Sequence, residues 1–179
     1  MKKALIFLIT GFEEIEALAT IDILRRGGVE IKSVSLTGDR TVAGGHRISV
    51  IADYLFEEAD FAGVQMLILP GGTVKFNEHD GLKREILAFS RQGKPIAAIC
   101  AAPMVLGGLG LLKDKRATCY PGYEKYLTGA HVTEAPVMVD GNITTGRAAG
   151  YTLDFALELL AQLTDREVSA ETARKLLAK

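Results

Sequence analysis

The sequence has only two cysteines, Cys100 and Cys119, among its 179 residues. So few cysteines cannot form the dense disulfide framework of a small secreted domain, and they favour a reducing compartment, which we take to be the cytoplasm. An excess of positive charge is also missing, because the formal net charge is −1 and no basic block occurs. We therefore expect no nucleic-acid partner, since non-specific nucleic-acid binding needs a basic surface.

Hydrophobic runs long enough to cross a membrane without interruption are absent as well. The uncharged stretch 95–112 approaches the required length, but Pro95, Pro103 and three glycines divide it. The apolar stretch 4–9 follows two lysines as in a signal peptide, yet it is too short, and acidic residues follow where a cleavage region should be. We interpret both stretches as parts of a soluble fold and expect no membrane partner.

Histidine is scarce, and the three present are His46, His79 and His131. None lies in a motif with the spacing of metal ligands, so we expect neither a metal nor another cofactor. The length and the ordinary balance of hydrophobic and charged residues predict one domain, residues 1–179, with a substantial core.

Short apolar runs alternate with amphipathic segments along the chain. Strands are predicted at 3–9, 29–36, 64–69, 95–99 and 116–120, long helices at 13–26, 82–92, 151–163 and 167–177, and short helical segments at 56–61, 104–106 and 124–127. Hairpins are predicted over 41–51 and, around Asp140-Gly141-Asn142, over 137–145. This alternation predicts an α/β fold: a mostly parallel sheet with helices on both faces and a small β-hairpin.

Ligands of such sheets bind beyond the carboxyl ends of the strands, and this rule directs attention to Cys100. An apolar strand, a cysteine, two alanines and a helix are similar to a nucleophile elbow. A thiol at the positive end of a helix favours the reactive thiolate, while an inert buried cysteine is the alternative. Cys119 is interpreted as a packed strand residue facing away from Tyr120, with a resolving thiol for Cys100 as its alternative.

Two further features are expected in the same cleft. Gly71-Gly72 follows the strand 64–69, and its backbone N–H groups can approach a ligand closely enough to bind an oxyanion, although a plain turn is the alternative. Glu16 lies at a helix start, where solvated acids that complement the helix dipole are common. If it turns toward the cleft, burial and a neighbouring thiolate would protonate it, and it could donate a hydrogen bond to the sulfur.

In their order along the chain, these residues resemble the ThiJ/PfpI superfamily, in its DJ-one branch. The matching segments are 11–16, 22–28, 69–72, 97–103, 145–147 and 154–157. The resemblance implies a flavodoxin-like three-layer sandwich that is usually a homodimer and needs no cofactor. It implies an oxidisable nucleophile at Cys100 and a protonated hydrogen-bond partner at Glu16. It also implies backbone donors at Gly72 and Ala101, and we add Gly71 to these candidate donors. Arg26 and Arg47 match positions near the cysteine pocket, often across the dimer interface, and the pocket also includes Tyr120 and Arg147.

The same resemblance implies a stress-protective enzyme of the glyoxalase or deglycase type. Its substrates would be α-oxoaldehydes, or glycated protein and nucleotide adducts, attacked by Cys100 with the help of Glu16. A redox sensor or chaperone switched by oxidation of Cys100 fits the same residues. A peptidase or amidase is disfavoured, because relatives with that activity have histidine where this chain has Ala101. The parkinsonism-associated member has histidine where this chain has Tyr120, and no residue supports the thiazole chemistry that the ThiJ name suggests.

Overall fold

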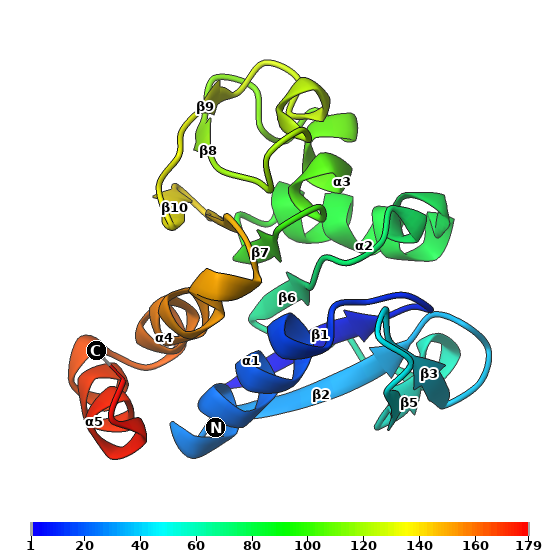
Figure 1. The fold of residues 1–179 in the computed structure, drawn as a ribbon. Helices are drawn as coiled ribbons and strands as arrows, with labels where there is room; N and C mark the ends of the chain where they lie inside the picture. The colour runs from blue at the N-terminus through cyan, green and yellow to red at the C-terminus, as the bar shows by residue number, and fades with distance from the viewer. Residues whose placement is uncertain (1, 179) are drawn as a thin grey trace.

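The computed structural model describes residues 2–178 and has a seven-stranded sheet at its centre (Figure 1). In order across the sheet the strands are β10 (Val137–Asp140), β11 (Ile143–Gly146), β7 (Ile96–Ile99), β6 (Met66–Leu69), β1 (Lys3–Leu8), β2 (Glu30–Ser35) and β5 (Tyr54–Leu55). Neighbouring strands pair in parallel, except that β10 and β11 form an antiparallel hairpin at one edge. The predicted, mostly parallel sheet is confirmed.

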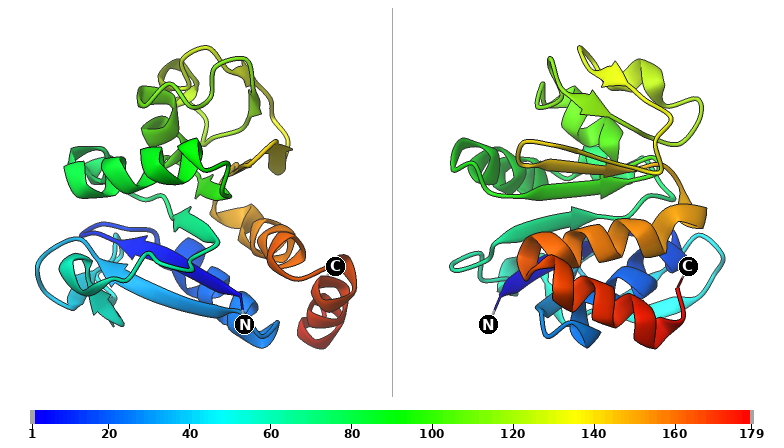
Figure 2. Two further views of the ribbon diagram at one scale, coloured as in Figure 1. Left: turned by 180° about the vertical axis from the view of Figure 1, so that it is seen from behind. Right: turned by 90° about the vertical axis from the view of Figure 1, so that its left-hand side faces the viewer.

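Helices cover both faces of this sheet (Figure 2). The α-helices are α1 (Glu14–Arg26), α2 (Asp80–Arg91), α3 (Pro103–Gly108), α4 (Thr152–Leu163) and α5 (Arg166–Leu176). On one face α1 packs on β1 and β2 and against α4, which in turn carries α5 on its outer side. On the other face α2 and α3 pack on β7. The result is the three-layer, flavodoxin-like sandwich that the resemblance implies. No helix within residues 2–178 is long and apolar enough to cross a membrane.

The layers follow from the local sequence. Residues 4–8 of β1 are buried on both sides, as is typical of a central parallel strand. Helix α1 has acidic residues in its first turn and Arg25 and Arg26 in its last, which complements the helix dipole. Gly27, directly after α1, lies so close to α4 that a Cβ there would meet Leu160 Cδ1 at 2.2 Å. The absence of a side chain therefore lets the two helices touch.

Four 3₁₀ turns and two small sheets complete the described fold. The turns are η1 (Phe56–Glu58), η2 (Lys75–Glu78), η3 (Glu124–Tyr126) and η4 (Ala149–Tyr151). Strands β3 (Thr41–Ala43) and β4 (Ser49–Ile51) form the predicted hairpin, separate from the main sheet. The helix predicted at 56–61 is shorter than expected, because only η1 forms there, and β5 and η2 were not predicted.

The strand predicted at 116–120 is wrong beyond its first two residues. Only β8 (Arg116–Ala117) forms, and it pairs with β9 (His131–Val132) in a small sheet above α3 (Figure 1). The following backbone N–H groups do not pair with β9. The Thr118 N–H donates to Thr145 Oγ1, and the Tyr120 N–H donates to the Cys100 carbonyl. Residues 118–120 therefore attach to the carboxyl ends of β7 and β11 instead of extending β8.

Candidate active site

Cys100 follows β7 in a sharp turn. Its φ of 65° lies in the left-handed region, which residues other than glycine rarely adopt. Two backbone hydrogen bonds of 2.9 Å hold it there, because its N–H donates to the Gly146 carbonyl and its own carbonyl accepts from the Tyr120 N–H. Strain of this kind persists where the surroundings over-determine the conformation, and it clusters at active sites. The turn has the elbow geometry that the sequence predicts, with the thiol half-buried.

Glu16 projects from the first turn of α1 into the same place and is 0% exposed. Its Oε2 accepts a 2.7 Å hydrogen bond from the Gly71 N–H. Its Oε1 has no regular hydrogen-bond partner within residues 2–178, and the Cys100 thiol is the side chain that interacts with the carboxyl group. Burial raises the pKa of Glu16 to about 7, against the opposing effects of the Gly71 N–H and the thiol. Glu16 can therefore hold a proton near neutral pH.

Gly71 and Gly72 lie between these two side chains and the start of α1. A Cβ at Gly71 would lie 2.6 Å from Cys100 Cβ and 2.8 Å from Glu16 Oε2, so a side chain there would displace both groups. Gly72 has a φ of 89°, and a Cβ there would lie 2.4 Å from the Glu13 nitrogen. The pair is therefore more than a plain turn: both positions require glycine to bring the backbone to the cysteine.

The electrostatics of Cys100 correct the sequence-based expectation of a thiolate favoured by a helix end. Burial, followed by the charge and hydrogen bond of Glu16, raises the pKa of Cys100 to about 12, although the N–H groups of Ala101 and Gly72 lower it. The helix contributes little, because α3 has only six residues and begins at Pro103. The elbow alone does not produce a free thiolate; the sulfur can be ionised only if Glu16 carries the proton.

Cys100 and Glu16 therefore form a coupled pair of acids. Interacting groups lose their protons in two steps that belong to the pair. Burial raises the pKa of Glu16 to about 7 and that of Cys100 to about 12, so above pH 7 the pair carries one negative charge and keeps one proton. With the proton on Glu16 the sulfur is a thiolate that can accept hydrogen bonds from the carboxyl group and from the N–H groups of Ala101 and Gly72.

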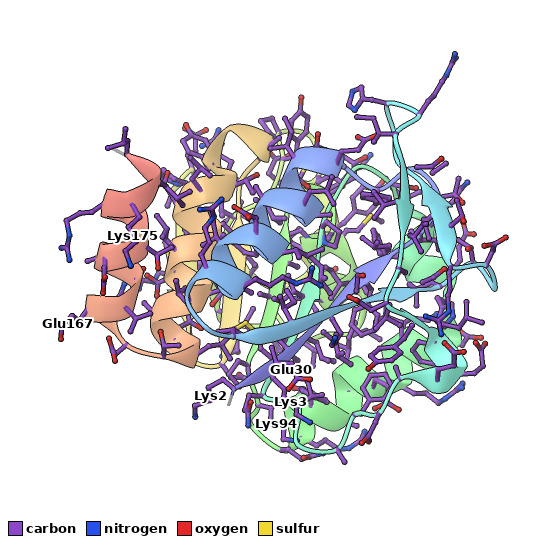
Figure 3. The ribbon with its side chains drawn as sticks, turned by 90° about the horizontal axis from the view of Figure 1, so that it is seen from below. Lys2, Lys3, Glu30, Lys94, Glu167 and Lys175 are labelled. Atoms are coloured by element: carbon purple, nitrogen blue, oxygen red, sulfur yellow. The ribbon has the colours of Figure 1, made fainter. Side chains whose placement is uncertain are left out.

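A shallow pocket of about 170 Å³ opens beside the sulfur. Its lining consists of Gly72, Cys100, Ala101, Tyr120 and Tyr123. Two larger hollows, of about 200 and 260 Å³, lie at the amino ends of the strands, beside Lys3 and Lys94 respectively. Figure 3 shows charged side chains, Lys2, Lys3 and Glu30 among them, at that end of the molecule. The small pocket lies instead at the carboxyl end of β7, where ligands of α/β sheets bind.

The structure does not place the three predicted arginines in this pocket within one chain. Arg26 pairs with Asp22 at the far end of α1, ten residues and thus about 15 Å of helix beyond Glu16. Arg147 pairs with Glu134, and Arg47 lies on the exposed turn between β3 and β4. Roles for these arginines in the pocket stay predictions, and for Arg26 and Arg47 they involve a second subunit.

Cys119 is 4% exposed and packs in the hydrophobic core, whereas its neighbour Tyr120 is 47% exposed. Burial and then the charge of Glu124 raise its pKa to about 11, against the effect of Arg147. These surroundings are typical of a packed cysteine and unfavourable for the thiolate that a resolving role requires. The contrast in exposure between Cys119 and Tyr120 agrees with the expected opposite facing, although no strand forms at these residues.

Sequence reasoning missed Tyr123 and the role of His46. Tyr123 lines the pocket, and the regular spacing of Tyr120, Tyr123 and Tyr126 could have indicated a shared face. His46 binds Glu14 through both its backbone N–H, at 2.6 Å, and its ring Nδ1, at 2.8 Å. This link fastens the turn between β3 and β4 to the start of α1, next to Glu16.

The same region holds a group of possible metal ligands. Glu13, Glu14 and His46 have ligand atoms within 4.8 Å of one another. Both carboxylates are already engaged, because Glu13 Oε2 accepts the N–H of Glu16 and Glu14 accepts both hydrogen bonds from His46. The cluster is thus accounted for by its structural role at the start of α1.

Comparisons with known proteins agree with this geometry. Protein DJ-1 homolog B of Arabidopsis thaliana is 35% identical over 99% of this chain, which spans only 42% of that relative. The Parkinson disease protein 7 homolog of Danio rerio is 31% identical, and the match covers 99% of this chain and 98% of the Danio rerio protein. A deglycase of Pyrococcus abyssi is 33% identical over 83% of this chain and 91% of its own.

Solved structures show the same fold. A cysteine-to-alanine mutant of a DJ-1 superfamily protein from Salmonella typhimurium has a TM-score of 0.95 at 33% identity, with both chains fully covered. DJ-1 of Toxoplasma gondii, solved in an oxidized form, has a TM-score of 0.94 at 31% identity and covers 99% of this chain and 98% of its own. The family model described as DJ-1/PfpI matches residues 2–162. The resemblance seen in the sequence motifs is therefore confirmed, and the chain belongs to the DJ-1/PfpI family.

Proposed function

We propose that this protein is a cofactor-free glyoxalase or deglycase that acts on α-oxoaldehydes or on their adducts with proteins and nucleotides. The observation that carries the proposal is the fully buried Glu16 carboxyl, held by the Gly71 N–H beside the Cys100 thiol. This arrangement offers a nucleophile and a proton carrier at one point. The deglycase of Pyrococcus abyssi supports the same reaction class.

The first step joins the sulfur to the aldehyde. In the pair's singly charged state with the proton on Glu16, the Cys100 thiolate attacks the aldehyde carbon and forms a carbon–sulfur bond. The developing oxyanion lies within reach of the N–H groups that face the sulfur, those of Gly72 and Ala101. Glu16 then gives its proton to that oxygen, which leaves a hemithioacetal and a Glu16 carboxylate.

The remaining steps move a proton between adjacent carbons. Glu16 removes the proton from the former aldehyde carbon and returns it to the neighbouring carbonyl carbon, while the hydroxyl proton of the hemithioacetal moves to the neighbouring carbonyl oxygen, so that one carbon is oxidised and the other reduced. The product is a thioester of a 2-hydroxy acid. Water cleaves the carbon–sulfur bond, releases the acid, and restores the proton to Glu16. With methylglyoxal the net reaction consumes one water and yields lactate, without an external oxidant or reductant.

Lactate production from methylglyoxal tests the scheme. Wild type should produce lactate, while Cys100→Ala should be inactive and Glu16→Gln should be slower by roughly 10²–10⁴-fold, the usual contribution of a general acid–base group. Cys119→Ala is the matched control for loss of a thiol and should retain activity. Equal lactate production by wild type, Cys100→Ala and Glu16→Gln would refute the scheme.

A redox sensor or chaperone switched at Cys100 is the second candidate. The solved, oxidized form of Toxoplasma gondii DJ-1 favours it, as does the difference in exposure between the half-buried Cys100 and the buried Cys119. A thiolate oxidises first to sulfenic and then to sulfinic acid. Mass spectrometry after mild peroxide treatment should find these products at Cys100, and equal oxidation of Cys119 would remove the sensor's specificity.

We further propose that the protein is a homodimer and works in the cytoplasm. Ile15 on α1 and Ile48 and Ile51 on the β3–β4 hairpin are 58%, 54% and 77% exposed, and exposed apolar side chains that gather on one face mark interaction surfaces. Both cysteines are free, which suits a reducing compartment. Sedimentation should show a dimer at micromolar concentration that Ile51→Asp weakens; a monomeric wild type would refute the dimer.

A further inference from the structure

Three tyrosines form a row of touching rings beside Cys100. The ring centroids of Tyr120 and Tyr123 are 6.5 Å apart with an edge-to-face tilt of 75°, and those of Tyr123 and Tyr126 are 5.9 Å apart at 51°. These separations and tilts are those of favourable aromatic pairs. Tyr120 and Tyr123 line the pocket at the sulfur, while Tyr126 is not part of the lining.

The backbone fixes this row in position. The Tyr120 N–H donates to the Cys100 carbonyl at 2.9 Å, and the N–H groups of Tyr123 and Tyr126 donate to the carbonyls of Tyr120 and Tyr123. Helix α3 lies directly behind, because a Cβ at Gly107 would be only 2.1 Å from the Tyr126 carbonyl oxygen. The backbone that carries the rings is therefore held between the elbow and α3, and the contacts between rings keep the row together.

The chemistry of the pocket is otherwise limited. Apart from Cys100 and the two tyrosines, its lining residues are Gly72 and Ala101, which offer backbone N–H groups and no polar side chain. Within residues 2–178, the lining includes no Asp, Glu, Lys, Arg or His. The pocket therefore presents donors for one carbonyl oxygen at one end and aromatic surface at the other. An uncharged molecule with a carbonyl group and an apolar, planar substituent matches both ends.

We infer that Tyr120 and Tyr123 determine specificity, and that the site takes α-oxoaldehydes carrying an aryl or bulky apolar substituent in preference to the smallest members of the class. This inference rests on the proposed function and narrows its substrate class. The aldehyde carbon would lie at the sulfur and the substituent against the two rings. Methylglyoxal, with a single methyl group, uses almost none of that surface.

Kinetics with phenylglyoxal and methylglyoxal test the inference. The readout is the ratio of the two kcat/KM values, which cancels differences in the folded fraction of each variant. Tyr120→Ala and Tyr123→Ala should each lower the phenylglyoxal-to-methylglyoxal ratio by roughly tenfold, the size of a lost aromatic pair. Tyr120→Phe should keep the ratio, because the ring remains. Tyr126→Ala, in the same row but outside the pocket, is the control and should stay near the wild-type ratio.

The outcomes separate the inference from the function it rests on. Cys100→Ala measures the background consumption of each aldehyde, including reaction with surface arginines. An active wild type whose ratio is unchanged in Tyr120→Ala and Tyr123→Ala would refute the aromatic specificity and leave the proposed function standing. So would a ratio that Tyr126→Ala lowers equally, because the effect would then not be local to the pocket. A wild type inactive on both aldehydes would refute the proposed function and the specificity with it.

Discussion

Replacing Glu16 by glutamine should remove a pH-dependent loss of folding stability that the wild-type protein shows. Burial raises the pKa of this carboxyl from its ordinary value of 4.5 to about 7. Between these two values the folded state binds more protons than the unfolded state, so wild-type stability falls as the pH rises. Each pKa unit is worth about 1.4 kcal/mol, so ionising Glu16 in the folded protein costs about 3 kcal/mol. Glutamine is isosteric, can still accept the Gly71 N–H, and does not titrate.

Urea denaturation of wild type and Glu16→Gln from pH 4.5 to pH 8 measures this cost. The free energy of unfolding of wild type minus that of the variant should fall by about 3 kcal/mol over the range and level off above pH 7. Groups common to both proteins, such as His46, cancel in the difference. Cys100 does not interfere, because burial raises its pKa and glutamine brings no new positive charge. A difference that stays constant with pH would refute the buried carboxyl and, with it, the proton carrier of the proposed mechanism.

Two further predictions concern the surroundings of the pair. Gly71→Ala should lower the melting temperature by roughly 5 °C and slow lactate formation, because its Cβ would lie less than 3 Å from atoms of Cys100 and Glu16. Gly150→Ala is the control in the calorimetric measurement, because a Cβ there meets nothing within 4 Å. Equal effects of the two substitutions would contradict the steric argument. His46→Ala should reduce stability most below pH 6.5, where protonated His46 bonds Glu14, and the deficit should shrink as the pH rises through the raised pKa of His46. Urea titrations at pH 5.5 and 8.5 check this, and a deficit that grows with pH would contradict the pairing.

The architecture could be predicted from the sequence because its signals are local. β1 and β7 are short apolar runs closed by turn residues, and the pair β10–β11 surrounds an Asp-Gly-Asn turn. Residues 118–120 could not be predicted in the same way. Their backbone groups bond to Cys100 and to Thr145, which are distant in the sequence, and a β-like composition gives no sign of that choice.

The candidate site could be predicted only in its parts. The elbow at Cys100 and the glycines at 71–72 have short motifs of their own. Glu16 does not, because an acid in the first turn of a helix is normally solvated, and its burial depends on Gly71, 55 residues away. The raised pKa of Cys100 was missed for a related reason: the helix end is visible in the sequence, whereas the desolvation and the Glu16 charge that outweigh it are not.

A cysteine paired with a carboxyl has different chemical abilities from a cysteine paired with an imidazole. The imidazole pair can be neutral overall and supplies a cationic acid for a departing amine, which peptide cleavage requires. Above pH 7 the pair of Cys100 and Glu16 carries one negative charge and one proton, and its pocket has no histidine among the residues that the structure describes. Addition to an aldehyde expels no leaving group in the attacking step and needs one proton, for the new oxyanion. In the proposed mechanism Glu16 supplies that proton and then becomes the base that the next step requires, so a pocket with Ala101 and Tyr120 lacks nothing that aldehyde chemistry needs.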